Sequence, residues 1–129
     1  MNVVRKAARQ LVGADGVTFV LRDGDYCWYV EEDAVGPLWK GQRFPLDVCV
    51  SGWVITNNAV AVIPDIYADP RVLVEAYRPT FVRSMAMVPV GDPAVGAIGA
   101  YWSSNHEATK DQLETLAAIA DSAIIQTDR

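Results

Sequence analysis

The two ends of the chain carry apolar residues at helical spacing. Near the start they recur every three or four positions as far as Leu11, and Gly13 then supplies a stop signal, which predicts a short helix. Near the end, Thr109 and Gln112 have the spacing of a capping box, in which two side chains satisfy first-turn amides. The apolar residues that follow include Leu113, Leu116, Ala117, Ile119, Ala120, Ala123, Ile124 and Ile125. So broad a stripe predicts a helix that covers two surfaces.

Strand-forming runs lie between these two helices. Residues 17–32 contain two such runs around Asp23-Gly24, a pair that tolerates the positive φ angles of a tight hairpin turn. Residues 84–91 and 95–103 are two longer runs that are apolar on both faces. Strands of this kind are typical of a sheet that is covered on both sides. The pattern therefore predicts a central antiparallel sheet between two layers.

The middle of the chain has a less regular pattern. Residues 36–46 are punctuated by glycine and proline and are predicted to form a loop. Residues 51–58 then suit a short helix, and residues 59–65 suit a short strand. From Pro70 to Pro79 the alternation fails, and the spacing favours one or two helical turns. Together these elements predict an α+β fold.

Composition and charge narrow the class of protein. A chain of 129 residues with half of them hydrophobic can bury a core as one domain. The net charge is -5 and the eleven basic residues are scattered, so no nucleic-acid partner and no membrane contact are expected. Cys27 and Cys49 lack CxxC spacing and a nearby histidine, which excludes a zinc site and argues against a disulfide framework. A reduced, cytoplasmic location is expected.

Five stretches, in this order and spacing, make the chain similar to the GAF family of small-molecule sensing domains. They are "LVGADGVTFVLRDGD", "SGWVITNNAVAVIPDI", "DPR", "RSMAMVPV" and "GAIGAYW". The resemblance implies a GAF-like, PAS-related α+β fold. Its central antiparallel sheet would have the N- and C-terminal helices on one face and a loop-helix cover on the other. It also implies that residues 1–129 are a single GAF domain of a larger signalling protein, such as a sensor histidine kinase of a two-component system.

Cys49 is the residue on which enzymatic chemistry would depend. Asp47 and Cys49 resemble the Asp-x-Cys motif of some tetrapyrrole-binding relatives, but the predicted cover, Asp65 to Ser84, lacks the second cysteine that normally accompanies it. The family also includes a reductase of free methionine sulfoxide, which needs a nucleophilic cysteine and a resolving partner. Cys27 could serve only if the two Cα atoms lie within ~7 Å. Free cysteines usually behave as small buried hydrophobes, so we expect Cys49 to be structural.

No cofactor, catalytic residue or metal ligand is identified from the sequence. His106 is the only histidine and stands in a polar segment before the last helix, which favours a solvated residue over a haem ligand. Relatives that bind cyclic nucleotides share Asn-Lys and Asp-Glu pairs that are missing here, although three arginines in or beside the cover leave that alternative open. No Ser-His-Asp order, phosphate loop or metal-ligand spacing is present.

The sequence therefore predicts a non-catalytic sensory domain that binds a small molecule or dimerises and signals to an attached output domain. The resemblance places five aromatic or methionine side chains around the cavity, although core packing explains each of them as well. These candidates are Trp28, Trp53, Tyr77, Phe81 and Met85. A homodimer through the terminal helices would use Leu113, Leu116, Ala120 and Ala123. The alternatives are a methionine sulfoxide reductase that uses Cys49 and a ligand-free dimerisation spacer with a filled pocket.

Overall fold

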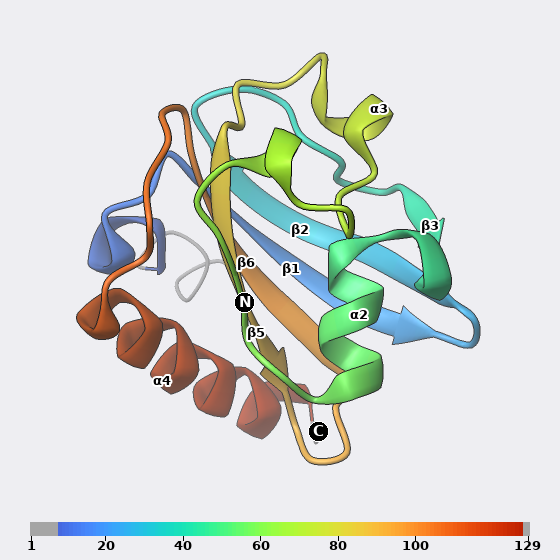
Figure 1. The fold of residues 1–129 in the computed structure, drawn as a ribbon. Helices are drawn as coiled ribbons and strands as arrows, with labels where there is room; N and C mark the ends of the chain where they lie inside the picture. The colour runs from blue at the N-terminus through green and yellow to red at the C-terminus, as the bar shows by residue number, and fades with distance from the viewer. Residues whose placement is uncertain (1–7, 128–129) are drawn as a thin grey trace.

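A six-stranded antiparallel sheet forms the centre of the protein, with helices on both of its faces (Figure 1). The computed structural model describes residues 8–127, with side chains described as far as Ser122. The strands are β1 (Gly16–Asp23), β2 (Tyr26–Ala34), β3 (Arg43–Pro45), β4 (Ala61–Ile63), β5 (Ser84–Val90) and β6 (Gly96–Trp102). They lie side by side in the order β3-β2-β1-β6-β5-β4. The predicted antiparallel sheet is confirmed.

The first hairpin follows the pattern predicted around Asp23 and Gly24. Gly24 has a φ of 60°, which a residue without Cβ adopts readily. β1 pairs with β2 on one side and with β6 on the other, and the register with β2 shifts between Phe19 and Val20. β1 therefore lies inside the sheet, which agrees with its mostly buried side chains.

One face of the sheet is covered by the terminal helical segments (Figure 1). Residues 8–12 are helical, as predicted, and the earlier part of that predicted helix lies outside the described residues. α4 (Lys110–Thr127) packs on β5 and β6 and buries Leu116 against Ile98 and its neighbours. The predicted capping box is present, because Thr109 Oγ1 accepts from Gln112 N and Gln112 Oε1 accepts from Thr109 N.

The cover occupies the opposite face of the sheet. It consists of the turn η1 (Leu46–Val48), α2 (Val50–Asn57), the turn η2 (Ile66–Ala68) and α3 (Val74–Tyr77), with the connecting loops. α2 packs on β5 and β6 from this side, so these two strands separate α2 from α4. Gly52 makes the close approach of α2 to η1 possible, since a Cβ at this position would lie 1.8 Å from the Leu46 carbonyl oxygen. The predicted arrangement, with the terminal helices on one face of the sheet and the cover on the other, is confirmed.

Two details differ from the sequence-based expectation. β3 lies within residues 36–46, which were predicted to be a loop, and it contains only three residues. The helix predicted from residue 51 begins at Val50, with Cys49 as its N-cap in an extended conformation.

In the described part of the chain, no helix is long and apolar enough to cross a membrane.

Candidate functional site

The space between the cover and the sheet is filled by the protein's own aromatic rings. The Trp39 ring centroid lies 4.7 Å from that of Tyr77, 5.3 Å from that of Tyr101 and 5.5 Å from that of Tyr29. Phe44 adds a further ring at 5.6 Å from Tyr29. A cavity of about 10 Å³ remains beside these rings, which is about the volume needed by one water molecule. In this conformation, the enclosed site has no room for a small-molecule ligand.

Glu32 fixes the loop that carries Trp39 into this space. Its carboxylate accepts three backbone N–H bonds, from Leu38 at 2.9 Å, Trp39 at 2.8 Å and Lys40 at 2.9 Å. The Trp39 indole then donates from Nε1 to the Ala76 carbonyl oxygen at 2.9 Å. These bonds join β2, the loop and α3 around one buried indole.

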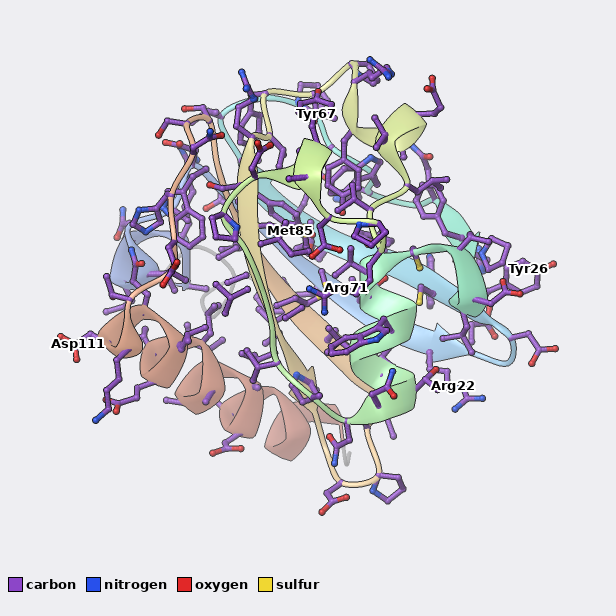
Figure 2. All side chains as sticks on the ribbon, viewed as in Figure 1. Arg22, Tyr26, Tyr67, Arg71, Met85 and Asp111 are labelled. Atoms are coloured by element: carbon purple, nitrogen blue, oxygen red, sulfur yellow. The ribbon has the colours of Figure 1, made fainter. Side chains whose placement is uncertain are left out.

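Two of the predicted pocket residues meet under the cover. Tyr77 lies in α3 and Met85 lies in β5. The Tyr77 hydroxyl donates a hydrogen bond to Met85 Sδ at 3.4 Å. Met85 can be followed in Figure 2 on the sheet behind the cover. Phe81 also packs on this cluster, but its ring lies close to Gly16 at the start of β1. Tyr77 and Met85 therefore contribute to the filled interior.

The prediction for Trp28 is corrected by the structure. In β2, Cys27 and Tyr29 are buried in the cover-side cluster, and alternate residues of a strand point to opposite faces. Trp28 therefore points away from the cover, where the guanidinium of Arg43 lies 4.6 Å from its ring centroid. It does not line the cover-side site.

Trp53 borders an open hollow of about 360 Å³ at the surface of the cover. The hollow lies between η1, α2 and the loop after η2, and it is lined by Leu46, Asp47, Val48, Cys49, Gly52, Trp53, Thr56, Asn57, Pro70 and Arg71. The guanidinium of Arg71 lies 4.4 Å from the Trp53 ring centroid, in a cation–π contact. Figure 2 shows Arg71 beside α2.

The charge of Arg71 is already matched within the protein. Its Nε and Nη2 donate to the two carboxylate oxygens of Asp69 at 3.0 and 2.7 Å. The hydrogen bonds from Arg71 hold the pKa of Asp69 below its usual range. The hollow therefore presents a neutralised ion pair and an indole face. Its other polar or ionisable side chains are Asp47, Cys49, Thr56 and Asn57.

A second surface hollow, of about 410 Å³, lies at the other end of the cover. It is lined by Pro37, Leu38, Trp39, Gln42, Phe44, Ala76, Pro79 and Thr80. Because none of these side chains titrates, this hollow offers apolar and weakly polar contacts but no acid–base or nucleophilic group.

Two thiols meet at the border between the first hollow and the interior. Cys27 Sγ and Cys49 Sγ are 3.6 Å apart, although 22 positions separate the residues in the sequence. Cys27 is fully buried on β2, whereas Cys49 is half-buried and lines the hollow. A hydrogen-bonded chain continues from Cys49 Sγ to Ser51 Oγ at 3.3 Å and from there to the Tyr29 hydroxyl at 3.0 Å.

The surroundings make these two thiols unequal. The pKa of Cys49 is lowered to about 6, chiefly because the Cys27 thiol hydrogen-bonds to the thiolate. The Ser51 hydroxyl and the Gly52 backbone N–H lower this pKa further, while burial opposes them. The pKa of Cys27 is raised, first by its hydrogen bond with Cys49 and then by burial. These contacts favour ionisation of Cys49 over that of Cys27.

Sequence reasoning missed two features of this site. It treated Cys49 as structural and made a partnership with Cys27 conditional on the distance between their Cα atoms, whereas the structure brings the two sulfur atoms to 3.6 Å. It also left Trp39 out of the selected pocket residues, although Trp39 is the centre of the aromatic cluster. The alternation of β2 would have placed Cys27 and Tyr29 on one face, but only the fold brings Cys49 to them.

The predicted dimer residues have mixed positions on α4. Leu116 and Ala120 are buried against the sheet, so they are core residues in this structure and offer no surface to a partner. Leu113 is partly buried on the same cluster. Ala123 lies within α4, but its side chain is outside the described part. Dimerisation itself stays a prediction.

Comparisons with known proteins agree with this architecture. A model of the GAF domain family matches residues 1–126. No curated protein matches the sequence. Among solved structures, the cyanobacteriochrome receptor PixJ superposes with a TM-score of 0.82 at 18% identity, over 98% of this chain and 91% of that chain.

Two further solved structures share the fold. The free methionine-R-sulfoxide reductase from Neisseria meningitidis has a TM-score of 0.75 at 21% identity, over 93% of this chain and 72% of that chain. The GAF-B domain of DevS from Mycobacterium smegmatis has a TM-score of 0.74 at 21% identity, over 95% of this chain and 86% of that chain. At such identities the similarity establishes the fold alone.

Proposed function

Because the chain belongs to the GAF domain family, we propose that it is a non-catalytic sensory or regulatory domain that binds a small molecule on its cover and signals to an attached output domain. The observation that carries the proposal is the open hollow of about 360 Å³ beside α2, which is within the usual size range of small-ligand sites. The enclosed interior is filled, so we assign the ligand to this hollow.

The lining favours a small neutral or cationic ligand with an apolar or aromatic part, because Asp47 and Cys49 add acidic groups to it. Trp53 offers a ring face, while Thr56 and Asn57 offer hydrogen-bonding groups. Arg71 is neutralised by Asp69, so a free anion would have to compete with an existing bidentate pair. This chemistry disfavours phosphate-bearing ligands such as cyclic nucleotides, unless Arg71 is released from Asp69.

The proposed signal passes through β5 and β6, which contact α2 on one face and α4 on the other. Along β5, Met85 and Met87 belong to the cover-side cluster, whereas Ala86 and Val88 belong to the α4-side cluster. A ligand that shifts α2 would therefore press on strands that support α4. We propose that α4 passes this shift to an output domain such as a histidine kinase in the cytoplasm, within a homodimer that uses exposed positions of the terminal helices.

Native mass spectrometry of protein purified from its own host tests the binding proposal. We expect a bound small-molecule mass on the wild-type protein and its loss in Thr56→Trp, because Thr56 is exposed on α2 and a larger side chain would fill the hollow. Val60→Trp is the matched control, since Val60 is also exposed but does not line the hollow. A wild-type protein that carries no ligand and is not stabilised by any member of a metabolite panel would contradict the proposal and favour the spacer.

The pair of thiols supports a second candidate, an enzyme that reduces free methionine sulfoxide. Two cysteines with sulfur atoms 3.6 Å apart satisfy the need for a nucleophile and a resolving partner. The measurement is conversion of free methionine-R-sulfoxide to methionine with dithiothreitol as the reductant. Turnover that disappears in Cys49→Ser would establish the enzyme, whereas wild-type turnover equal to the buffer background would remove it.

A further inference from the structure

We infer that Cys27 and Cys49 form a reversible dithiol–disulfide site that hydroperoxides oxidise, with Cys49 reacting first and Cys27 resolving it. The inference concerns the thiol pair itself and does not require a ligand in the hollow. It rests first on the distance of 3.6 Å between the two Sγ atoms. A disulfide needs the sulfur atoms to approach to about 2.05 Å, so a movement of about 1.5 Å closes the bond.

Access to solvent distinguishes the two thiols. Cys49 is half-buried and lines the open hollow, so a small oxidant reaches its sulfur from the surface. Cys27 is fully buried on β2, so its sulfur is not exposed to a dissolved oxidant. The order of reaction follows from this geometry, with Cys49 as the peroxide-reactive thiol and Cys27 as the resolving thiol.

The neighbours of Cys49 stabilise it as a thiolate. Ser51 Oγ lies 3.3 Å from Cys49 Sγ and donates to the sulfur when it is ionised. The lowered pKa of Cys49, to about 6, agrees with this arrangement. Asp47 is the acidic group whose charge opposes ionisation, and its effect is smaller than those of the hydrogen bonds from Cys27, Ser51 and Gly52. Redox-sensing cysteines generally combine such a pKa with exposure and a resolving partner.

The reaction balances in two steps. In the first, the Cys49 thiolate attacks the peroxide: an S–O bond forms and the O–O bond breaks. The leaving group is hydroxide from hydrogen peroxide or alkoxide from an organic hydroperoxide, and it takes a proton to become water or the alcohol. Sulfur loses two electrons and the peroxide gains them, so Cys49 becomes a sulfenic acid. In the second, Cys27 sulfur attacks Cys49 sulfur: an S–S bond forms, the S–O bond breaks, and hydroxide leaves with the Cys27 proton as water. A thiol reductant reverses the disulfide by exchange.

The disulfide would connect the cover directly to the sheet. Cys27 lies on β2, and Cys49 is the N-cap of α2. In the reduced protein, the start of α2 is joined to β2 by side-chain packing and by the Ser51–Tyr29 hydrogen bond. A covalent link at this place restricts movement of α2, which is the element that borders the hollow. The redox state of the pair thereby regulates the same face that we propose for ligand binding.

The test treats the reduced 129-residue protein with hydrogen peroxide and with cumene hydroperoxide, followed by alkylation and intact mass measurement. For the wild-type protein, we expect a mass lower by about 2 Da, loss of both alkylatable thiols and full recovery with dithiothreitol. Slower hydrogen exchange at the start of α2 in the oxidised form is expected as the structural readout. Cys49→Ser is expected to keep its Cys27 thiol under the same treatment.

Cys27→Ala separates the two steps. This variant is expected to form a sulfenic acid at Cys49 that dimedone captures, with no intramolecular disulfide. Because Cys27 is buried, the circular dichroism of the Cys27→Ala variant is first compared with that of the wild type. The wild-type and Cys49→Ser results stand even if this variant misfolds. Oxidation of wild-type Cys49 to a sulfinic acid, a gain of about 32 Da without loss of the Cys27 thiol, would overturn the inference. A disulfide that forms with methionine sulfoxide but not with either hydroperoxide would also overturn it and would support the reductase.

Discussion

The indole of Trp39 and the ring of Tyr77 lie with their centroids 4.7 Å apart in the space where the sequence predicted a ligand cavity. Trp39 is also bonded to the Ala76 carbonyl oxygen, next to Tyr77 in α3. These contacts hold the cover against the sheet through side chains and leave little free volume. The cover of this domain is therefore part of its hydrophobic core.

We predict that Trp39→Ala costs about 3–5 kcal/mol of unfolding free energy, because it removes a buried aromatic side chain and leaves a cavity under the cover. Urea denaturation followed by circular dichroism measures the change. Trp28→Ala is the matched control: Trp28 lies on the other face of the sheet and is half-buried beneath Arg43, so a clearly smaller loss is expected. Equal losses for the two variants would contradict the central role of Trp39.

Glu32→Gln is predicted to destabilise the protein by about 2–3 kcal/mol, because hydrogen bonds to a charged acceptor are worth more than those to a neutral one. The carboxylate accepts from three consecutive backbone amides, and an amide side chain has only one acceptor oxygen. Glu75→Gln serves as the control, since Glu75 makes an exposed pair with Arg78 and should change stability little. A neutral effect of Glu32→Gln would mean that the loop is held by packing alone.

Local signals in the sequence were sufficient to predict much of the fold. The turn at Gly24 and the capping box of Thr109 and Gln112 depend on residues close together in the chain, and both are present as predicted. β3 gave no such signal, because a three-residue edge strand has too few positions for alternation to be recognised. Its pairing with β2 is set by tertiary structure.

The candidate site was harder to predict from the sequence, because it depends on contacts between residues far apart in the chain. Cys49 and Cys27 come together because η1 and α2 fold back over β2, and no spacing in the sequence reports that distance. Resemblance to a family with a cavity also placed Trp28 in the site, whereas its position in the alternation of β2 relative to Cys27 indicates the other face. The shape of a cavity depends on which large side chains enter it, and Trp39 decides that here.

The two surfaces of α4 can be separated by mutation. We predict that Leu116→Ala lowers the unfolding free energy by about 2–5 kcal/mol, since Leu116 is fully buried against the sheet. Ala117→Glu should leave stability nearly unchanged, because Ala117 is exposed in this structure. If the protein is a homodimer through α4, sedimentation of Ala117→Glu should show a shift towards monomer. A wild-type protein that sediments as a monomer at high concentration would refute the dimer proposal.

The capping box of α4 provides a smaller and local prediction. Thr109→Ala removes the hydroxyl that accepts from the Gln112 amide, and we expect a loss of about 1 kcal/mol. Thr115→Ala is the control within the same helix, because its hydroxyl bonds only to the Asp111 carbonyl oxygen one turn earlier. Alanine is the better helix former at such a position, so stability should be unchanged or slightly higher. Thermal unfolding of the two variants gives the comparison, and equal losses would exclude a specific effect of the cap.

The reactivity of Cys49 should depend on pH in a way that ordinary thiols do not. The pKa of Cys49 is lowered from 9.0 to about 6, so most of this side chain is thiolate at neutral pH, and the thiolate is the form that alkylates. We predict that the alkylation rate with iodoacetamide is nearly constant above pH 7 and falls about tenfold per pH unit well below pH 6.

Cys27→Ala provides the decisive comparison, since the bond from Cys27 is the main cause of the lowered pKa. Its rate profile should shift to higher pH, so that alkylation at pH 7 becomes slower although the sulfur is no less exposed. Cys49→Ser should react slowly at every pH in this range, because the remaining thiol of Cys27 is buried and its pKa is raised. A wild-type rate that keeps rising up to pH 9 would show that the two thiols are not coupled as the structure has them, and the order of oxidation would then rest on solvent exposure alone.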